Sequence, residues 1–214
     1  MPYSHIDGTA RFMGDTVSRD ISGFARPALR VSMNLYGAPA LDAREFHGRK
    51  QDLIVGVSLQ VAPPWGQYDA TRLVNVSSHR WSVKPEIGVS KAWGAWTLEV
   101  QAAATLFGDN DRFLGDNVRS QRPVYALQGH AIYGFASGTW LSLDATWFTG
   151  GRTDVNGRVN NDLQRNARIG FVFAMPVNRR NSVKFTASSG VVTRTGSDFD
   201  AVGIAWQYRW GGGL

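Results

Sequence analysis

Three residues in the second half of the chain have the types that a hydrolytic triad requires: His130, Ser142 and Asp144. A serine nucleophile needs a histidine base within hydrogen-bond reach and a third group that orients the histidine. Ser142 and Asp144 are two residues apart, so in a strand their side chains share one face. No nucleophile motif surrounds Ser142, however. We therefore interpret His130 as a polar lining residue rather than a catalyst, and we expect no enzymatic activity.

The stretches that carry these residues alternate polar and apolar side chains with a period of two, which is typical of a strand with two unlike faces. From Trp96 to Leu106, for example, Leu98 and Val100 alternate with Glu99 and Gln101. The pattern predicts nine strands of about ten residues, the length that a tilted strand needs to cross a bilayer. They are expected at Leu29–Tyr36, Leu53–Val61, Trp81–Ser90, Trp96–Leu106, Tyr125–Phe135, Thr139–Phe148, Asn166–Met175, Ser182–Val191 and Val202–Trp210.

The connections between these stretches alternate in length. They are short at 91–95, 136–138 and 176–181, and long at 63–79, 108–122, 150–165 and 192–201. The connection at 37–50 is expected at the rim of the short turns and is longer than usual there. Short turns at one rim and long loops at the other are typical of an outer-membrane barrel. The predicted fold class is therefore all-β, a transmembrane antiparallel up-and-down β-barrel of the outer-membrane type.

The strand count sets an expectation for the N-terminal part. The last strand descends to the periplasm and bacterial barrels have an even number of strands, so nine is one short. We expect about 10 to 12 strands in a complete barrel, with one or more N-terminal strands missing here. Residues 1–27 are expected to be a partly irregular N-terminal segment with a strand remnant near Thr9–Met13, and residues 28–214 to form the barrel domain. The residues after Met1 do not resemble a signal peptide, so an export signal is expected upstream.

Composition narrows the class further. No apolar run reaches the roughly 18 residues of a membrane helix, and there is no cysteine for a disulfide or thiol chemistry. The net charge of +6 could suggest nucleic-acid binding, but Arg and Lys are scattered without a basic stripe, so no nucleic-acid partner is expected. Aromatic residues mark the strand ends, as in the girdles that sit at the two membrane interfaces; the predicted girdle consists of Trp81, Trp93, Trp96, Tyr125, Tyr133, Trp147, Tyr208 and Trp210.

The polar residues within the strands form the predicted lumen lining. A charge that faces lipid at mid-depth costs about 2 to 4 kcal/mol, so these residues are expected to face the interior. They are Arg30, Asn34, Gln60, Lys84, Glu86, Glu99, Gln101, Gln128, His130, Asp144, Arg168, Lys184, Gln207 and Arg209. Their excess of Arg and Lys favours anionic or polar solutes. Alternatively, mutual salt bridges fill the small interior and seal it.

Several segments also resemble a known family of outer-membrane proteins that is associated with the MetA pathway of phenol degradation. The resembling stretches are 34–40, 80–90, 96–99, 150–153 and 206–210. The resemblance implies an outer-membrane barrel with a transport role for small molecules, with aromatic or hydrophobic solutes as candidates. A sealed structural or lipid-interacting barrel and, less favoured, a hydrolase at the barrel rim remain the alternatives.

The remaining motifs carry weaker expectations. Asp109–Asp111 and Asp116–Asn117 lack the glycine and the closing glutamate of a calcium loop, so no metal or other cofactor is expected. Arg152 and Arg158 are expected either to contact lipopolysaccharide phosphates or to gate the mouth of the barrel. Trp210 is expected to serve as the terminal aromatic residue that the barrel-assembly machinery reads, because the chain ends in Gly211 to Leu214.

Overall fold

The computed structural model describes all residues except 1, 13–14, 43–44, 46–48, 197 and 212–214. Nine long strands form one antiparallel sheet in the order β15-β14-β13-β10-β9-β6-β5-β4-β3. Their bounds are β3 Leu29–Tyr36, β4 Leu53–Ala62, β5 Ser82–Trp93, β6 Trp96–Phe107, β9 Val124–Gly134, β10 Trp140–Gly150, β13 Gln164–Pro176, β14 Asn181–Val192 and β15 Ala201–Tyr208. Each predicted strand is therefore confirmed, with small shifts at its ends.

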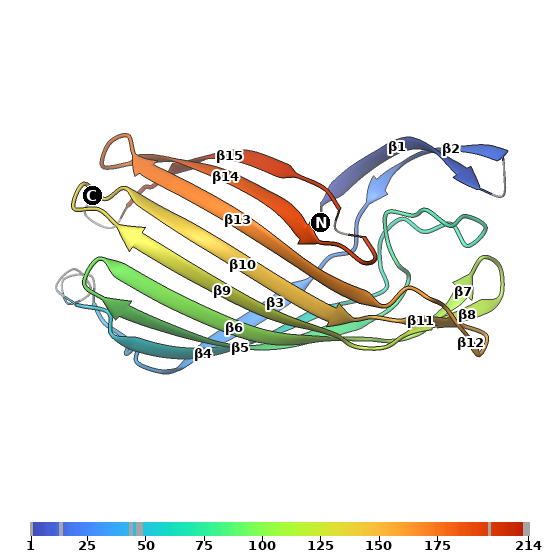
Figure 1. Ribbon diagram of the computed structural model, residues 1–214, viewed down its shortest axis with the longest axis horizontal. Coiled ribbons are helices and arrows are strands. Elements are labelled where there is room, and N and C mark those ends of the chain that lie inside the picture. Colours follow the sequence, from blue (N-terminus) through green and yellow to red (C-terminus); the bar gives the residue numbers. More distant parts are fainter. Residues whose placement is uncertain (1, 13–14, 43–44, 46–48, 197, 212–214) are drawn as a thin grey trace.

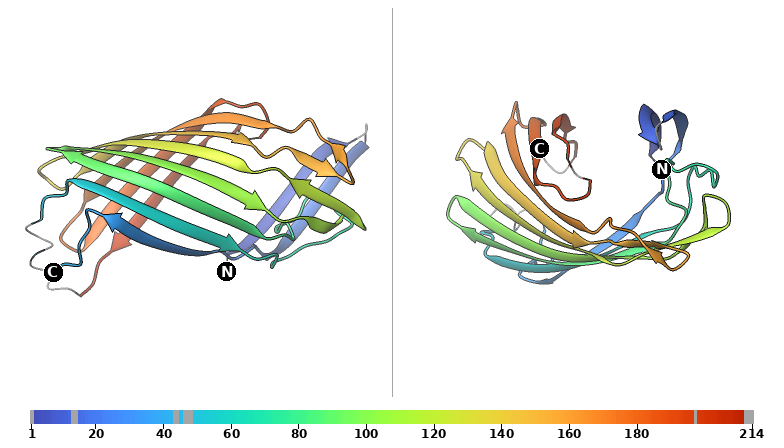
Figure 2. Two further views of the ribbon diagram at one scale, coloured as in Figure 1. Left: turned by 90° about the horizontal axis from the view of Figure 1, so that it is seen from below. Right: turned by 45° about the vertical axis from the view of Figure 1, so that its right-hand side comes forward.

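The sheet curves into a trough, which Figure 2 shows from two further directions. Within the described residues, backbone pairing leaves β3 and β15 as the two edges of the sheet. The number of strands in a closed barrel, expected to be 10 to 12, stays a prediction.

The two ends of the sheet differ as the loop lengths predict. Tight turns join β5 to β6, β9 to β10 and β13 to β14 at one end, where β3 also ends and β4 begins after a longer connection. The other long connections lie at the opposite end (Figure 1). Gly94 (φ 57°) and Gly138 (φ 82°) lie in two of the tight turns, in the left-handed region that glycine adopts without a Cβ clash. We refer to the end with the long connections as the outer rim.

The long connections contain short strands that the sequence pattern does not reveal. β7 (Asn110–Phe113), β8 (Asn117–Gln121), β11 (Thr153–Val155) and β12 (Arg158–Val159) form a four-stranded sheet, which we call the rim sheet. These strands have two to five residues. Such short segments cannot display a recognisable period.

The N-terminal residues form a hairpin rather than a partly irregular segment with one strand remnant. β1 (Tyr3–Phe12) and β2 (Asp15–Phe24) pair along their whole length, and Met13 lies outside the described residues. The hairpin contacts the β4–β5 connection, where Gln67 donates its backbone N–H to the Phe24 carbonyl at 2.8 Å. Polar residues occupy both faces: Asp7 lies opposite Asp20 on one face, and Arg19 lies opposite Gly8 on the other. Because neither face is consistently apolar, the sequence lacks the alternation that identifies the other strands.

Candidate lumen lining

The strand register places the predicted lining residues on a single face of the nine-stranded sheet. Arg30, Gln60 and Lys84 lie opposite one another across β3, β4 and β5. Residues directly opposite in an antiparallel pair project from the same face. The same register continues through Glu99, His130 and Asp144, through Gln101 and Gln128, and onward to Asn34, Glu86, Arg168, Lys184 and Gln207. Arg209 lies just beyond β15 and donates its backbone N–H to the Arg180 carbonyl at 2.8 Å.

Exposure identifies this polar face as the concave side of the trough. In β6, Leu98 and Val100 are exposed while Glu99 and Gln101 between them are half-buried. Side chains on the inside of a curved sheet crowd one another, whereas those on the outside spread apart, so the half-buried polar face is the inner one. Among the described residues, the buried apolar side chains are only Ile21, Ala62 and Ala174. The apolar face therefore needs an environment other than water to cover it.

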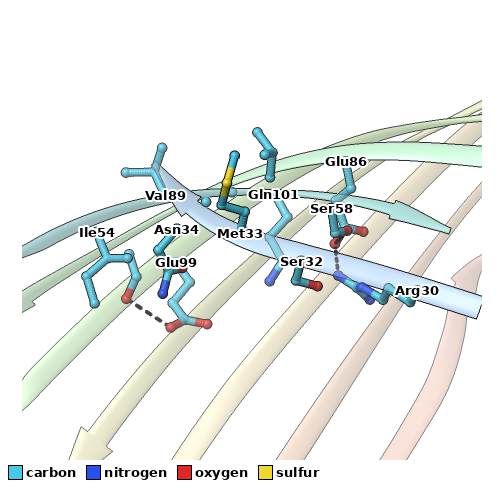
Figure 3. A pocket seen from close by; sticks show the side chains of 14 residues that line it. Arg30, Ser32, Met33, Asn34, Ile54, Ser58, Glu86, Val89, Glu99 and Gln101 are labelled. Atoms are coloured by element: carbon cyan, nitrogen blue, oxygen red, sulfur yellow. Dashed lines mark hydrogen bonds and ion pairs between the residues drawn. The ribbon is translucent and has the colours of Figure 1, made fainter. Parts of the chain in front are cut away.

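A carboxylate near the β3 edge organises the first polar cluster of the concave face. The Glu86 side chain is 8% exposed and accepts a hydrogen bond from the Arg30 guanidinium, which reaches across β4 (Figure 3). Lys84 Nζ lies 3.1 Å from Glu86 Oε2, and Ser58 Oγ donates to Glu86 Oε1 at 3.3 Å. Two cations and a hydroxyl therefore satisfy a carboxylate that would otherwise be costly to remove from water.

A hollow of about 200 Å³ lies beside this cluster, lined by Arg30, Asn34, Glu86, Glu99 and Gln101 among others. Figure 3 shows their side chains gathered between β3 and the strands behind it. Ser90 donates its hydroxyl to Glu99 at 2.9 Å, and Gln51 donates to Ser90 at 2.8 Å. The hollow is thus lined by hydrogen-bonding groups from four neighbouring strands.

The geometry around His130 does not match a hydrolytic triad. His130 Nδ1 lies 2.7 Å from Asp144 Oδ1, and Ser142 Oγ donates to that same oxygen at 2.5 Å. A triad needs the histidine between the serine and the carboxylate. Here the carboxylate lies between the other two, and the Ser142 residue is only 3% exposed. The arrangement satisfies Asp144 and leaves no base for the serine.

The far side of the trough carries a second polar region. Arg168 donates to Ser188 Oγ at 3.1 Å, and its guanidinium carbon lies 4.0 Å from the centre of the Phe199 ring. A hollow of about 430 Å³ is lined here by Gln128, Asp144, Thr146 and Arg168, among others. Polar lining is therefore present along both walls of the trough.

Asn166, at the outer end of this wall, is fully buried. Its side-chain carbonyl accepts the backbone N–H of Arg194 at 2.7 Å, and its amide donates to the Thr195 carbonyl at 2.8 Å. These two hydrogen bonds hold the connection between β14 and β15 against the end of β13.

The predicted aromatic girdle residues lie toward the two ends of the sheet. Trp93, Trp96 and Tyr133 occupy consecutive paired positions near the tight turns, and the Trp96 and Tyr133 rings are 5.0 Å apart. Tyr125 and Trp147 lie near the outer rim on the same apolar face, and Trp81 directly precedes β5 there. Tyr208 ends β15 at the tight-turn end, and its ring stacks with that of Trp210 at 6.3 Å. The assignment of these residues to membrane interfaces stays a prediction.

The predicted list of lining residues leaves out small polar residues that share the concave face. Ser58, Ser90, Thr146 and Ser188 hold the same register as the predicted lining residues. Trp206, on the apolar face, was also missed and is 64% exposed. Each of these residues lies an even number of positions from a residue of known face on its own strand, so the period-two alternation that assigned Glu86 and Arg168 to the polar face could have located all of them.

The Asp- and Asn-rich loop serves the rim structure. Asn110 is 4% exposed, donates to Tyr68 Oη at 2.8 Å and accepts the Arg112 N–H at 3.0 Å. In the described part of the chain, no group of three or more His, Asp or Glu residues is close enough to hold a metal ion. No helix of the described residues is long and apolar enough to cross a membrane. Lipopolysaccharide contacts by Arg152 and Arg158, and the role of Trp210 in assembly, stay predictions.

A curved sheet of nine antiparallel strands with a polar inner face, an exposed apolar outer face and loops of alternating length defines an outer-membrane β-barrel protein. Comparison with known proteins agrees with this class of fold. The chain belongs to the family described as "Putative MetA-pathway of phenol degradation", whose model matches residues 1–208. The resemblance inferred from the sequence, the fold class and the location in the bacterial outer membrane are thus confirmed.

One similar solved structure is an outer-membrane channel from Pseudomonas putida F1. It has a TM-score of 0.74 and 19% sequence identity, over 90% of this chain and 71% of that one. No curated protein matches the chain.

Proposed function

We propose that this protein is a passive channel that conducts small polar solutes along its concave face. The observation that carries the proposal is the continuous polar lining, which runs from Arg30 on β3 to Gln207 on β15. Polar and charged groups replace part of the hydration shell of a solute that crosses an otherwise apolar barrier. The similar solved structure bears the name of an outer-membrane channel, which agrees with this function.

The ion pairs of the concave face favour an open lumen over a sealed one. Glu86 pairs with Lys84 on its own strand and with Arg30 two strands away, and Asp144 is hydrogen-bonded to His130 on the adjacent strand. These contacts run along the wall of the trough rather than across it. A plug of mutual salt bridges would instead need partners from opposite walls.

The solute class follows from the lining and from the family. Cations and carboxylates both lie on the concave face, so we propose small, hydrophilic or amphipathic solutes. The family description refers to phenol degradation, and small aromatic solutes with polar substituents are consistent with it. Hydrophobic solutes without polar groups would gain little from this lining.

The test is single-channel recording of the purified protein in planar bilayers, together with swelling of proteoliposomes in arabinose. We expect discrete conductance steps and swelling faster than that of empty liposomes. Glu99→Gln should shift the reversal potential in a salt gradient toward anion preference. Asp111→Asn, which removes the same charge from an exposed rim position, should shift it less.

The alternatives predict different results. A sealed structural barrel would give neither conductance nor swelling, which would overturn the proposal. A hydrolase at the rim would cleave lipid or peptide substrates and lose that activity in Ser142→Ala. The geometry around Asp144 argues against this last outcome.

A further inference from the structure

A cavity at the outer rim has a charge pattern that the lumen does not share. Its volume is about 490 Å³, and its walls come from the segment before β3, the β4–β5 connection and the rim sheet. Arg26, Arg80 and Arg119 contribute from three separate segments, together with Tyr68, Leu73 and Phe113. We call this the arginine cavity. Its volume falls in the range of sites for small molecules.

Arg80 is the most confined of the three arginines. One of its terminal nitrogens donates to Gln121 Oε1, and its guanidinium carbon lies 4.4 Å from the centre of the Phe107 ring. Its Nε and Nη1 atoms are buried and make no hydrogen bond with any described residue. A buried guanidinium with two unsatisfied donors is unfavourable unless an anion compensates it.

The electrostatics of Arg80 reflect this confinement. Burial, and after it the positive charges of Arg119 and Arg26, lower the pKa of Arg80 to about 10. Asp109 acts in the opposite direction but does not restore the ordinary value. Three guanidinium groups without an acidic lining residue give the cavity an excess of positive charge.

No lining residue of the arginine cavity is acidic. Within the described residues, Arg26 Nη1 donates to neutral acceptors, Ser78 Oγ at 3.3 Å and the Arg80 carbonyl at 3.4 Å. The Arg119 guanidinium lies 5.0 Å from the Phe113 ring centre, and its charge also acts on Asp162 in the rim sheet region. The carboxylates Asp109 and Asp162 therefore offset part of the charge from outside the cavity, while the walls remain cationic.

We propose that the arginine cavity binds a small organic carboxylate at the outer mouth of the channel. The planar guanidinium groups match a carboxylate, and Tyr68, Leu73 and Phe113 supply apolar contacts for an organic body beside it. This inference rests on the proposed channel function, because it identifies a solute class that the rim would concentrate before entry. The arginine cavity differs from the lumen lining, because its arginines have no acidic residue in the cavity wall, whereas the lumen carboxylates Glu86, Glu99 and Asp144 each have a partner.

The test is isothermal titration of the detergent-solubilised protein with benzoate, with its neutral analogue benzamide and with inorganic phosphate. We expect saturable benzoate binding, and binding of benzamide and phosphate that is at least tenfold weaker. Arg119→Gln and Arg26→Gln should each weaken benzoate binding about tenfold, which corresponds to about 1.4 kcal/mol. Arg158→Gln removes an exposed rim charge outside the cavity and should change it less than twofold.

The folded state of each variant is checked by the gel migration shift between heated and unheated samples. Equal binding of benzoate and benzamide, no effect of Arg119→Gln, or phosphate binding as tight as benzoate binding would overturn the inference. Because conductance is measured separately, a conducting protein that does not bind benzoate would contradict only this inference, and a protein that binds benzoate without conducting would contradict only the channel function.

Discussion

The two faces of the nine-stranded sheet are built from the same strands, but the outer face exposes apolar side chains and the inner face encloses polar ones. On the outer face Val100 is 54% exposed and Ile169 49% exposed, whereas on the inner face the Glu86 side chain is 8% exposed and lies among charged and hydroxyl partners. A soluble sheet places its apolar residues inside. The inversion teaches that lipid, rather than a packed core, covers the apolar face of this protein, and that the interior is held together by polar contacts.

The largest effect is expected from moving a charge to the wrong face. Ile169 lies near the middle of β13 on the apolar face. Ile169→Arg should lower the free energy of unfolding in liposomes by about 2 to 4 kcal/mol, because the guanidinium would lie in hydrocarbon at mid-depth. Urea titration followed by tryptophan fluorescence measures the change.

Val172 provides the matched control for this substitution. It lies on the same strand but on the concave face, opposite Ser142 and Thr186. Val172→Arg should cost less than about 1 kcal/mol, because a lumen arginine remains hydrated. Equal destabilisation by the two substitutions would mean that the two faces do not differ as we describe.

A smaller effect is expected from removing the acceptor at the centre of the first polar cluster. Glu86→Gln leaves Arg30 and Lys84 beside a neutral group and should lower the free energy of unfolding by about 1 to 3 kcal/mol. Glu99→Gln, where one serine hydroxyl donates to the carboxylate, should cost less. If the order were reversed, the inner face would not depend on its ion pairs.

The smallest effect is expected at the outer rim, which belongs neither to the apolar outer face nor to the polar inner face of the sheet. Burial raises the pKa of Asp162, but hydrogen bonds from the Thr153 hydroxyl and backbone N–H lower it more, so the native value lies below the ordinary 3.8. The carboxylate therefore contributes stability that is complete above pH 3.8 and is lost as the pH falls through the lower native value. The protection factor of the Thr153 amide in hydrogen exchange should fall in that acidic window, while those of the lumen strands should not. Asp162→Asn should abolish this pH dependence; an unchanged acid response in that variant would contradict the assignment.

Period-two alternation predicted the strands and the face of each lining residue, because a one-residue shift would have moved every polar side chain into lipid. It therefore located Glu99, His130 and Asp144 on adjacent strands, and the structure shows them opposite one another. It did not predict that Asp144 would lie between His130 and Ser142, because the order of side chains within a cluster depends on rotamers rather than on spacing.

The rim could not be predicted in the same way. β7, β8, β11 and β12 are too short for a period, and the hairpin of β1 and β2 has no consistent apolar face. Arg26, Arg80 and Arg119 are separated by 54 and 39 residues in the sequence. Only the folded connections bring them to one cavity, so the spacing of basic residues alone gives no indication of it.

The most direct test of the two-faced sheet uses the absence of cysteine from the sequence. Thr146 and Ala145 are adjacent on β10, with Thr146 on the concave face and Ala145 on the apolar one. Thr146→Cys and Ala145→Cys, each in proteoliposomes, are exposed to a charged, membrane-impermeant thiol reagent. The account predicts fast labelling of the Thr146→Cys protein and little labelling of the Ala145→Cys protein. Equal labelling, or preferential labelling at position 145, would contradict the claim that the polar face lines a water-filled lumen.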